Sequence, residues 1–213
     1  MLLNNVIFDF DGTLVDSLQD VLDCLKLAFE KCGVTVKSYD TGKIMHLQLR
    51  ETIGTIAPGI TVKQTDQVIT RFKNIYDSID YPNTRLMPTV AELLPKLYER
   101  SVAMFIVSNK RQVPTIRILE KLNIRHFFKG IFNPDMYEGE KWMTKSELLA
   151  HALRKYSLPK DLTAYIGDSE VDVTAAKENG IRAIAVKNGY GDVAAFTIKP
   201  DSLFQQINEI LNV

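Results

Sequence analysis

The chain has 213 residues, of which 46% are hydrophobic and 24% charged, so it can bury one core, or one core plus a small accessory domain. Its 26 basic and 26 acidic residues balance, and no overall field favours nucleic acid or an anionic membrane. No apolar run reaches the ~18 residues that a membrane-spanning helix needs. We expect neither of those partners, and a monomer or homodimer.

The first predicted element is a short buried strand, the apolar run 6–10, which Gly12 ends with a turn. Side chains alternate along a strand, so Asp9 and Asp11 point to the same side. Crowded carboxylates resist burial, and a stable fold then needs a compensating cation or a chemical use for them. A simple polar turn would explain Asp11 but not Asp9, which favours a functional role for the pair.

Residues 17 to 80 read as helices without a convincing strand. Apolar stripes of helical period cover 17–33 and the stretch that follows Thr61, where Gln64 completes a capping-box signature, and a broken helical pattern covers 40–57. Cys24 and Cys32 lie about 12 Å apart along the first of these helices, too far for a disulfide. Reduced thiols, with a first motif so near Met1 that no signal peptide fits before it, predict a cytoplasmic protein.

Beyond residue 89 helices and strands alternate. Buried strands are predicted at 102–107, 130–132, 162–166 and 181–186, with helices between them. Thr89 and Glu92 predict a capping box at one helix start, and Asp201 is expected to begin a last helix through Leu211. This alternation predicts a doubly wound parallel sheet, a Rossmann-like α/β core of residues 1–16 and 82–213 with an all-helical cap domain inserted at 17–81.

Three predicted strands end in polar residues, and ligands of such sheets bind beyond the carboxyl ends of the strands. Asp9 with Asp11, Ser108 with Asn109, and Asp168 should therefore converge on one crevice. An ionised aspartate there can attack phosphorus, and its neighbour can protonate the leaving alcohol and then deprotonate water. Carboxylates suit Mg²⁺, and a lysine would have to add positive charge.

The stretches Asp-Phe-Asp-Gly-Thr-Leu-Val-Asp-Ser, Ile-Val-Ser-Asn-Lys and Tyr-Ile-Gly-Asp-Ser-Glu-Val-Asp resemble the motifs of haloacid dehalogenase-like phosphohydrolases over nearly the whole chain. The helical insert and Asn-Gly-Tyr-Gly resemble the phosphoglycolate phosphatase-like members. The resemblance implies that Asp9 is the nucleophile and Asp11 the acid/base. It also implies a phosphoryl- and substrate-binding set of Thr13, Ser108 and Asn109, and a Mg²⁺ set of Asp9, Asp11 (through its backbone carbonyl), Asp168 and Asp172, the last through water or indirect contacts.

The catalytic lysine of the resemblance has two candidates, Lys141 and Lys145. Lys145 is favoured, because a cation in the first turn of a helix capped by Thr144 opposes the helix dipole and invites a functional explanation. Either could instead be a solvated surface lysine, and Asp172 could simply cap its helix with Ser169.

Two residues of the insert, His46 and Arg50, occupy the stretch that lines the substrate in relatives. Surface placement is the commoner use of such residues, and contact with substrate is the alternative hypothesis for them.

Together these features predict a Mg²⁺-dependent phosphomonoesterase acting through an aspartyl-phosphate on a small phosphorylated metabolite, either phosphoglycolate-like or a sugar phosphate. One alternative is a sugar-phosphate mutase, which would return the phosphoryl group to a sugar. The other is a non-catalytic regulatory module that keeps the fold.

Overall fold

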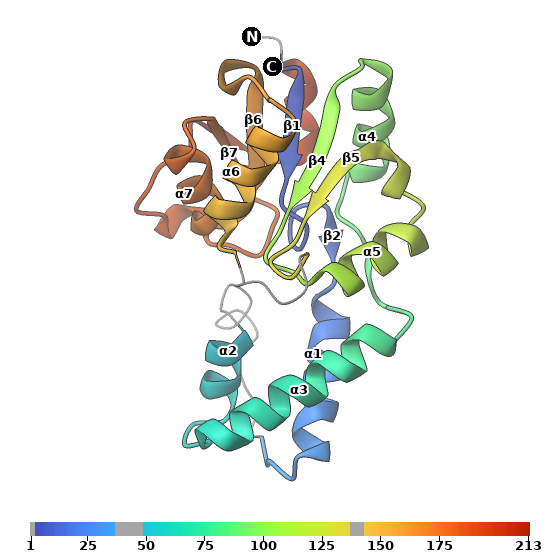
Figure 1. The fold of residues 1–213 in the computed structure, drawn as a ribbon, viewed down its shortest axis with the longest axis vertical. Helices are drawn as coiled ribbons and strands as arrows, with labels where there is room; N and C mark the ends of the chain where they lie inside the picture. Colours follow the sequence, from blue (N-terminus) through green and yellow to red (C-terminus); the bar gives the residue numbers. More distant parts are fainter. Residues whose placement is uncertain (1–2, 37–48, 137–142) are drawn as a thin grey trace. The chain divides into compact units, whose positions relative to one another are not determined.

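The computed structural model describes residues 3–36, 49–136 and 143–213. The chain forms two compact units, one of residues 1–16 and 85–213 and the other of residues 17–84 (Figure 1). The predicted insert, 17–81, ends three residues earlier than the second unit. His46 and Lys141 lie outside the described residues.

The larger unit is built on six strands: β1 (Asn5–Phe8), β4 (Ala103–Val107), β5 (Phe128–Phe132), β6 (Thr163–Gly167), β7 (Arg182–Val186) and β8 (Ser202–Phe204). They form one sheet in the order β5-β4-β1-β6-β7-β8, and every neighbouring pair is parallel. Apolar side chains on both faces of β1 are fully buried, as a parallel sheet covered on both sides requires. The predicted α/β fold class is confirmed.

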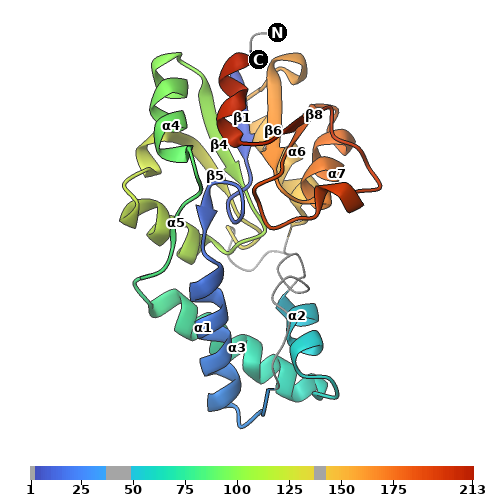
Figure 2. The same cartoon turned by 180° about the vertical axis from the view of Figure 1, so that it is seen from behind.

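Helices and 3-10 turns precede, connect or follow these strands: α4 (Val90–Glu99), α5 (Gln112–Lys121), η2 (Arg125–Phe127), α6 (Lys145–Lys155), η3 (Lys160–Leu162), α7 (Glu170–Glu178), η4 (Val193–Ala195) and, after β8, η5 (Ile207–Asn212). One face of the sheet packs against α6 and α7, where Ile7, Phe105 and Tyr165 share a core cluster with Leu148 and Val173. On the opposite face η5 packs against α4 (Figure 2). Helices thus cover both faces of the central part of the sheet.

Two predictions near the ends of elements are wrong. Thr89 does precede α4, but it has a left-handed backbone with φ of 68° and its side chain makes no capping hydrogen bond. The expected last helix from Asp201 is instead strand β8 followed by η5, because Ser202 to Phe204 pair in parallel with Ile184 to Val186 of β7. The spacing of apolar residues there is compatible with a helix, but pairing with the edge strand β7 stabilises a strand instead.

The smaller unit contains α1 (Leu18–Lys31), α2 (Leu49–Ile56) and α3 (Val62–Ser78), and the predicted Thr61–Gln64 capping box at the start of α3 is confirmed. Its two ends are tied together by Asp20, a buried residue of α1. The Asp20 carboxylate accepts hydrogen bonds from the backbone N–H groups and the side chains of both Asn83 and Thr84. This Asp20 clasp explains why the unit extends to residue 84.

Two short strands stand where the larger unit is interrupted. β2 (Val15–Asp16) and β3 (Arg85–Leu86) pair in antiparallel register, with Asp16 opposite Arg85.

Both cysteines are free thiols. Among the described residues, no helix combines the length and the apolar character needed to cross a bilayer.

Candidate active site

The carboxyl ends of the central strands bring together residues that are far apart in sequence. Asp9 directly follows β1, Ser108 follows β4 and Asp168 follows β6, and β1 lies between the other two strands in the sheet. The side chains of all three are buried. This is the edge at which ligands bind in doubly wound sheets.

Asp9 lies at the centre of this edge with only 6% of its surface exposed. One carboxylate oxygen lies 3.0 Å from Nζ of Lys145. The other, Oδ1, is buried and has no hydrogen-bond partner within the described part of the chain. A buried carboxylate oxygen is costly to leave unsatisfied, so this atom is suited to hold a cation or to react.

Lys145 is the first residue of α6, where the predicted cap by Thr144 is present and forms a capping box with Glu147. Its side chain is 4% exposed, and Nζ lies 2.6 Å from Oδ1 of Asp172 as well as beside Asp9. A lysine at a helix N-terminus opposes the helix dipole, and here two buried carboxylates compensate for that position.

Asp172 caps α7 and also pairs with Lys145. Its carboxylate accepts hydrogen bonds from the backbone N–H and the hydroxyl of Ser169, which completes a capping box for α7. It also pairs with Lys145 and accepts from the hydroxyl of Tyr165, which lies buried in β6. A Cβ on Gly167 would lie 2.2 Å from the Asp172 carboxyl carbon, so this approach requires glycine.

Asp168 is enclosed by a loop that the sequence motifs did not single out for this purpose. It accepts hydrogen bonds from the Thr13 hydroxyl at 3.0 Å and from the backbone N–H groups of Tyr190 and Gly191. A Cβ on Gly189 would lie 2.1 Å from Cβ of Asp168. The Asn-Gly-Tyr-Gly stretch therefore holds the Asp168 carboxylate in place, and the Thr13 hydroxyl is committed to the same task.

The three acids Asp9, Asp168 and Asp172 each offer one oxygen to a group whose members lie within 4.8 Å of one another. Hard divalent cations prefer carboxylate oxygens as ligands. Asp9, one of the three acids, has a carboxylate oxygen without a hydrogen-bond partner among the described residues. The donor set therefore fits a divalent metal ion.

The electrostatics of the group support that fit. Burial raises the pKa of Asp9 to about 8. The Lys145 ammonium lowers this pKa, but the carboxylates of Asp172 and Asp168 raise it further. Burial and then Asp172 likewise raise the pKa of Asp168 to about 6. Burial lowers the pKa of Lys145, but Asp172 and Asp9 outweigh it and hold that pKa above its usual range. Three carboxylates share one ammonium group, so added positive charge would favour ionised Asp9.

Asp11 lies outside this group of three acids, and its side chain makes a different contact. Both of its carboxylate oxygens accept from Nζ of Lys110, at 2.9 and 3.1 Å. Lys110 appeared in the second motif, but sequence reasoning gave it no role. The contact spans 99 positions of sequence, and only the folded sheet brings the two residues together.

Ser108 and Asn109 begin the loop after β4. The Ser108 hydroxyl is buried and accepts from the backbone N–H of Lys110 at 3.3 Å, and the Asn109 side chain is partly exposed. Asn133, fully buried after β5, donates to the Lys110 carbonyl and to the Thr115 hydroxyl, which fixes the loop. Asn133 was missed because no local pattern marks an asparagine that braces a distant loop.

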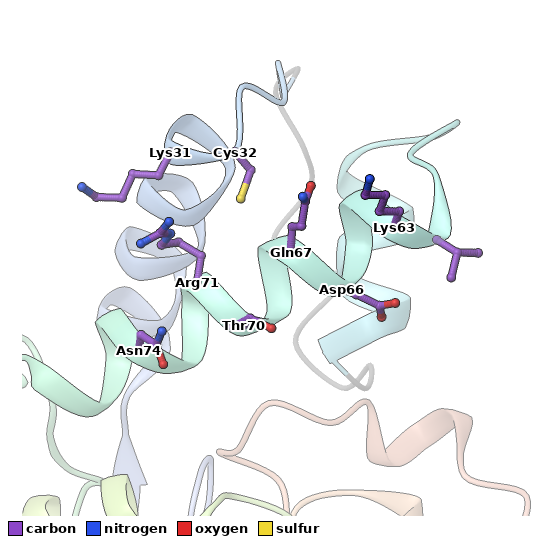
Figure 3. A pocket seen from close by; sticks show the side chains of 9 residues that line it. Lys31, Cys32, Lys63, Asp66, Gln67, Thr70, Arg71 and Asn74 are labelled. Carbon is purple, nitrogen blue, oxygen red and sulfur yellow. The ribbon is translucent and has the colours of Figure 1, made fainter.

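Arg50 belongs to the smaller unit, where its guanidinium pairs with Asp66 at the surface. A pocket of about 920 Å³ lies in the same unit between the end of α1 and α3, and Asp66 is one of its lining residues (Figure 3). In its lining, Lys31 extends from the end of α1 and Lys63 from the start of α3 (Figure 3). Among the described residues, none of the predicted site residues lines this pocket.

Comparison with known proteins identifies relatives over most of the chain. Residues 6–186 match the family model described as haloacid dehalogenase-like hydrolase. The phosphoglycolate phosphatase of Pseudomonas fluorescens is 27% identical over 87% of this chain and 70% of its own length, and that of Vibrio cholerae is 26% identical over 98% and 95%. A haloacid dehalogenase-like family hydrolase from Streptococcus pneumoniae superposes with a TM-score of 0.85 at 26% identity, covering 99% of this chain and 97% of its own.

Proposed function

Because the chain belongs to the haloacid dehalogenase-like hydrolase family and is a phosphatase, we propose that it hydrolyses a small phosphate monoester through an aspartyl-phosphate on Asp9, with Mg²⁺ as its metal. The observation that carries the proposal is the buried Asp9 carboxylate, which is paired with Lys145 through one oxygen and has no partner for the other among the described residues.

In the first step a carboxylate oxygen of Asp9 attacks phosphorus. The new O–P bond forms as the ester P–O bond breaks, and Asp11 gives a proton to the departing alcohol oxygen. In the second step Asp11 takes a proton from water, which attacks the phosphorus of the acyl phosphate. Phosphate leaves and the Asp9 carboxylate is regenerated. Ser108 binds a phosphoryl oxygen, and Lys145 compensates the charge that collects around Asp9.

Asp9 and Asp168 would hold the metal, with the backbone carbonyl of Asp11 as a third ligand and Asp172 acting through Lys145 and water. When bound, a divalent cation neutralises the phosphoryl oxygens and the crowded carboxylates. The backbone N–H groups of Tyr190 and Gly191 fix the orientation of the Asp168 carboxylate. Asp168 would therefore be preorganised as a metal ligand.

We propose a phosphorylated metabolite of few carbons as the substrate, with phosphoglycolate and sugar phosphates as the first candidates. The relatives named phosphoglycolate phosphatase support this choice. We also place the protein in the cytoplasm, supported by its two free thiols.

Phosphate release tests the proposal directly. The protein is incubated with a panel of phosphorylated metabolites and with 4-nitrophenyl phosphate, each with Mg²⁺ and with a chelator. We expect Mg²⁺-dependent phosphate release from at least one metabolite and from the aryl ester. Isomerisation of a sugar phosphate without phosphate release would instead identify a mutase, and binding without any turnover would identify a non-catalytic module.

Replacing Asp168 by Ala should weaken metal binding, because it removes a ligand that neighbouring groups hold in place. We expect the Mg²⁺ concentration for half-maximal activity to rise at least ~10-fold, in line with the effects of disturbing metal-site residues. The measurement is a metal titration of 4-nitrophenyl phosphate turnover. Asp161→Ala, at an exposed position before β6, is the control and should leave the titration unchanged. An unchanged titration in Asp168→Ala would remove Asp168 from the ligand set.

A further inference from the structure

The loop Gly189-Tyr190-Gly191 packs directly against Asp168. A Cβ on Gly189 would lie 2.1 Å from Cβ of Asp168, and a Cβ on Gly191 would lie 2.0 Å from the Asp168 carbonyl oxygen. The two glycines permit this close approach, but glycine also has the most backbone freedom to lose on folding. Of the three residues in the loop, Tyr190 is the one with a side chain that can fix it.

The Tyr190 side chain contacts the turn that follows β1 in two ways. Its hydroxyl donates to Oδ1 of Asp16 at 2.7 Å, across 174 positions of sequence. Its ring lies over Gly12, where a Cβ would come within 3.0 Å of the ring atom Cδ2. Both the tip and the edge of the tyrosine therefore rest on residues 12–16.

Backbone hydrogen bonds hold this turn in place. The N–H of Gly12 donates to the Val15 carbonyl at 2.9 Å, and the N–H of Val15 donates to the Phe10 carbonyl at 3.0 Å. Val15 and Asp16 then form β2, which pairs with β3. A group that is hydrogen-bonded to Asp16 is therefore anchored to an ordered part of the larger unit.

The same turn supports the Asp168 carboxylate at both of its oxygens. The Thr13 hydroxyl donates directly to Oδ1 at 3.0 Å. The backbone N–H of Tyr190 donates to Oδ2 at 2.7 Å, and the hydroxyl of Tyr190 ties that backbone to Asp16 of the turn. Hydrogen bonds of this kind orient a carboxylate that ligates a metal ion.

We infer that Tyr190 is a positioning residue for the metal site, because its hydrogen bond to Asp16 fixes the loop whose N–H groups orient Asp168. The inference rests on the proposed function, in which Asp168 is a Mg²⁺ ligand, and it adds the side chains of Tyr190 and Asp16 to the groups that act on this ligand. Without the hydrogen bond, Asp168 would have more freedom to lose when it binds the cation, so metal binding should weaken in a protein that still folds.

The test is Mg²⁺ binding to the substrate-free protein, measured by isothermal titration calorimetry. Tyr190→Phe removes the hydroxyl alone, and we expect the Mg²⁺ dissociation constant to rise about 10-fold, the lower end of the range for groups that orient metal ligands. The Mg²⁺ concentration for half-maximal turnover of 4-nitrophenyl phosphate should rise by a similar factor. The matched control is Tyr98→Phe, at a tyrosine that is 61% exposed on α4, and it should bind Mg²⁺ as the wild type does.

Two variants of Asp16 separate the hydrogen bond from the charge. Asp16→Asn and Asp16→Ala both remove the negative charge, but the amide keeps an oxygen that can accept from the Tyr190 hydroxyl. We expect Asp16→Ala to weaken Mg²⁺ binding as much as Tyr190→Phe does, and the double variant to weaken it no further. Asp16→Asn should keep most of the wild-type affinity.

Two results would overturn the inference: wild-type Mg²⁺ affinity in a folded Tyr190→Phe protein, or equal losses in Asp16→Asn and Asp16→Ala, which would make the charge responsible. Thermal melting in a chelator shows whether each variant is folded. The Asp16 comparison needs no Tyr190 variant, so a poorly folded Tyr190→Phe protein does not block the decision. Failure of the proposed function looks different, because the wild type itself would then bind no Mg²⁺ or release no phosphate.

Discussion

Asp9→Asn is expected to abolish turnover. The amide has the same shape but is a poor nucleophile, so the aspartyl-phosphate cannot form. Residual activity should fall below about one per cent of wild type, since the whole covalent route is lost. Phosphate release measures turnover, and acid quenching during turnover of a labelled ester should trap a phosphoenzyme in the wild type only. The exposed variant Asp161→Asn should behave as wild type, whereas a trapped phosphoenzyme in Asp9→Asn would place the nucleophile elsewhere.

The same variant should change how the stability of the metal-free protein depends on pH. The Asp9 pKa is raised from 3.8 to about 8, so the folded state holds a proton that the unfolded chain releases. Such a group stabilises the fold fully below its unfolded pKa, and this contribution is lost as pH rises through about 8. Thermal melting of the wild type in a chelator should therefore show stability falling as the pH rises from 3.8 to about 8. The same rise in pH should cost Asp9→Asn less stability.

Lys145→Met is expected to cost both activity and stability. It leaves Asp9 and Asp172 buried without their cation, and breaking a buried ion pair by removing one partner costs about 3–5 kcal/mol. Turnover should fall at least ~100-fold, because charge compensation dominates phosphoryl transfer. Chemical denaturation in a chelator should show a larger loss near pH 8 than near pH 5, because the pKa of Asp9 is raised to about 8 and its protonated carboxyl group no longer needs the ammonium at pH 5.

The control for this effect is Lys155→Met, at an exposed position near the end of the same helix. It should change the free energy of unfolding by well under ~1 kcal/mol, the usual size of a helix-dipole contribution at the surface. If Lys145→Met matched it in both stability and activity, Lys145 would contribute to neither the fold nor the reaction.

The fold and the positions of the strand ends could be predicted because the signals are local. Alternation along 6–10 and the Gly12 turn specify where Asp9 lies, and the Thr144 capping box specifies where Lys145 begins its helix. By contrast, the pairing of Asp11 with Lys110, the enclosure of Asp168 by the Gly189 loop and the support from Asn133 depend on how distant strands pack. Single-sequence periodicity contains no information on those contacts.

The Asp20 clasp has a consequence for how this enzyme could diversify. It closes the helical unit on itself, and in the larger unit Asp16 and Arg85 are paired directly across β2 and β3. The chain therefore leaves the catalytic unit and re-enters it at neighbouring positions, which a short hairpin turn would suffice to join. In evolutionary terms, recombination at these two positions could exchange or delete the whole helical module, while the residues of phosphoryl transfer remain under separate selection.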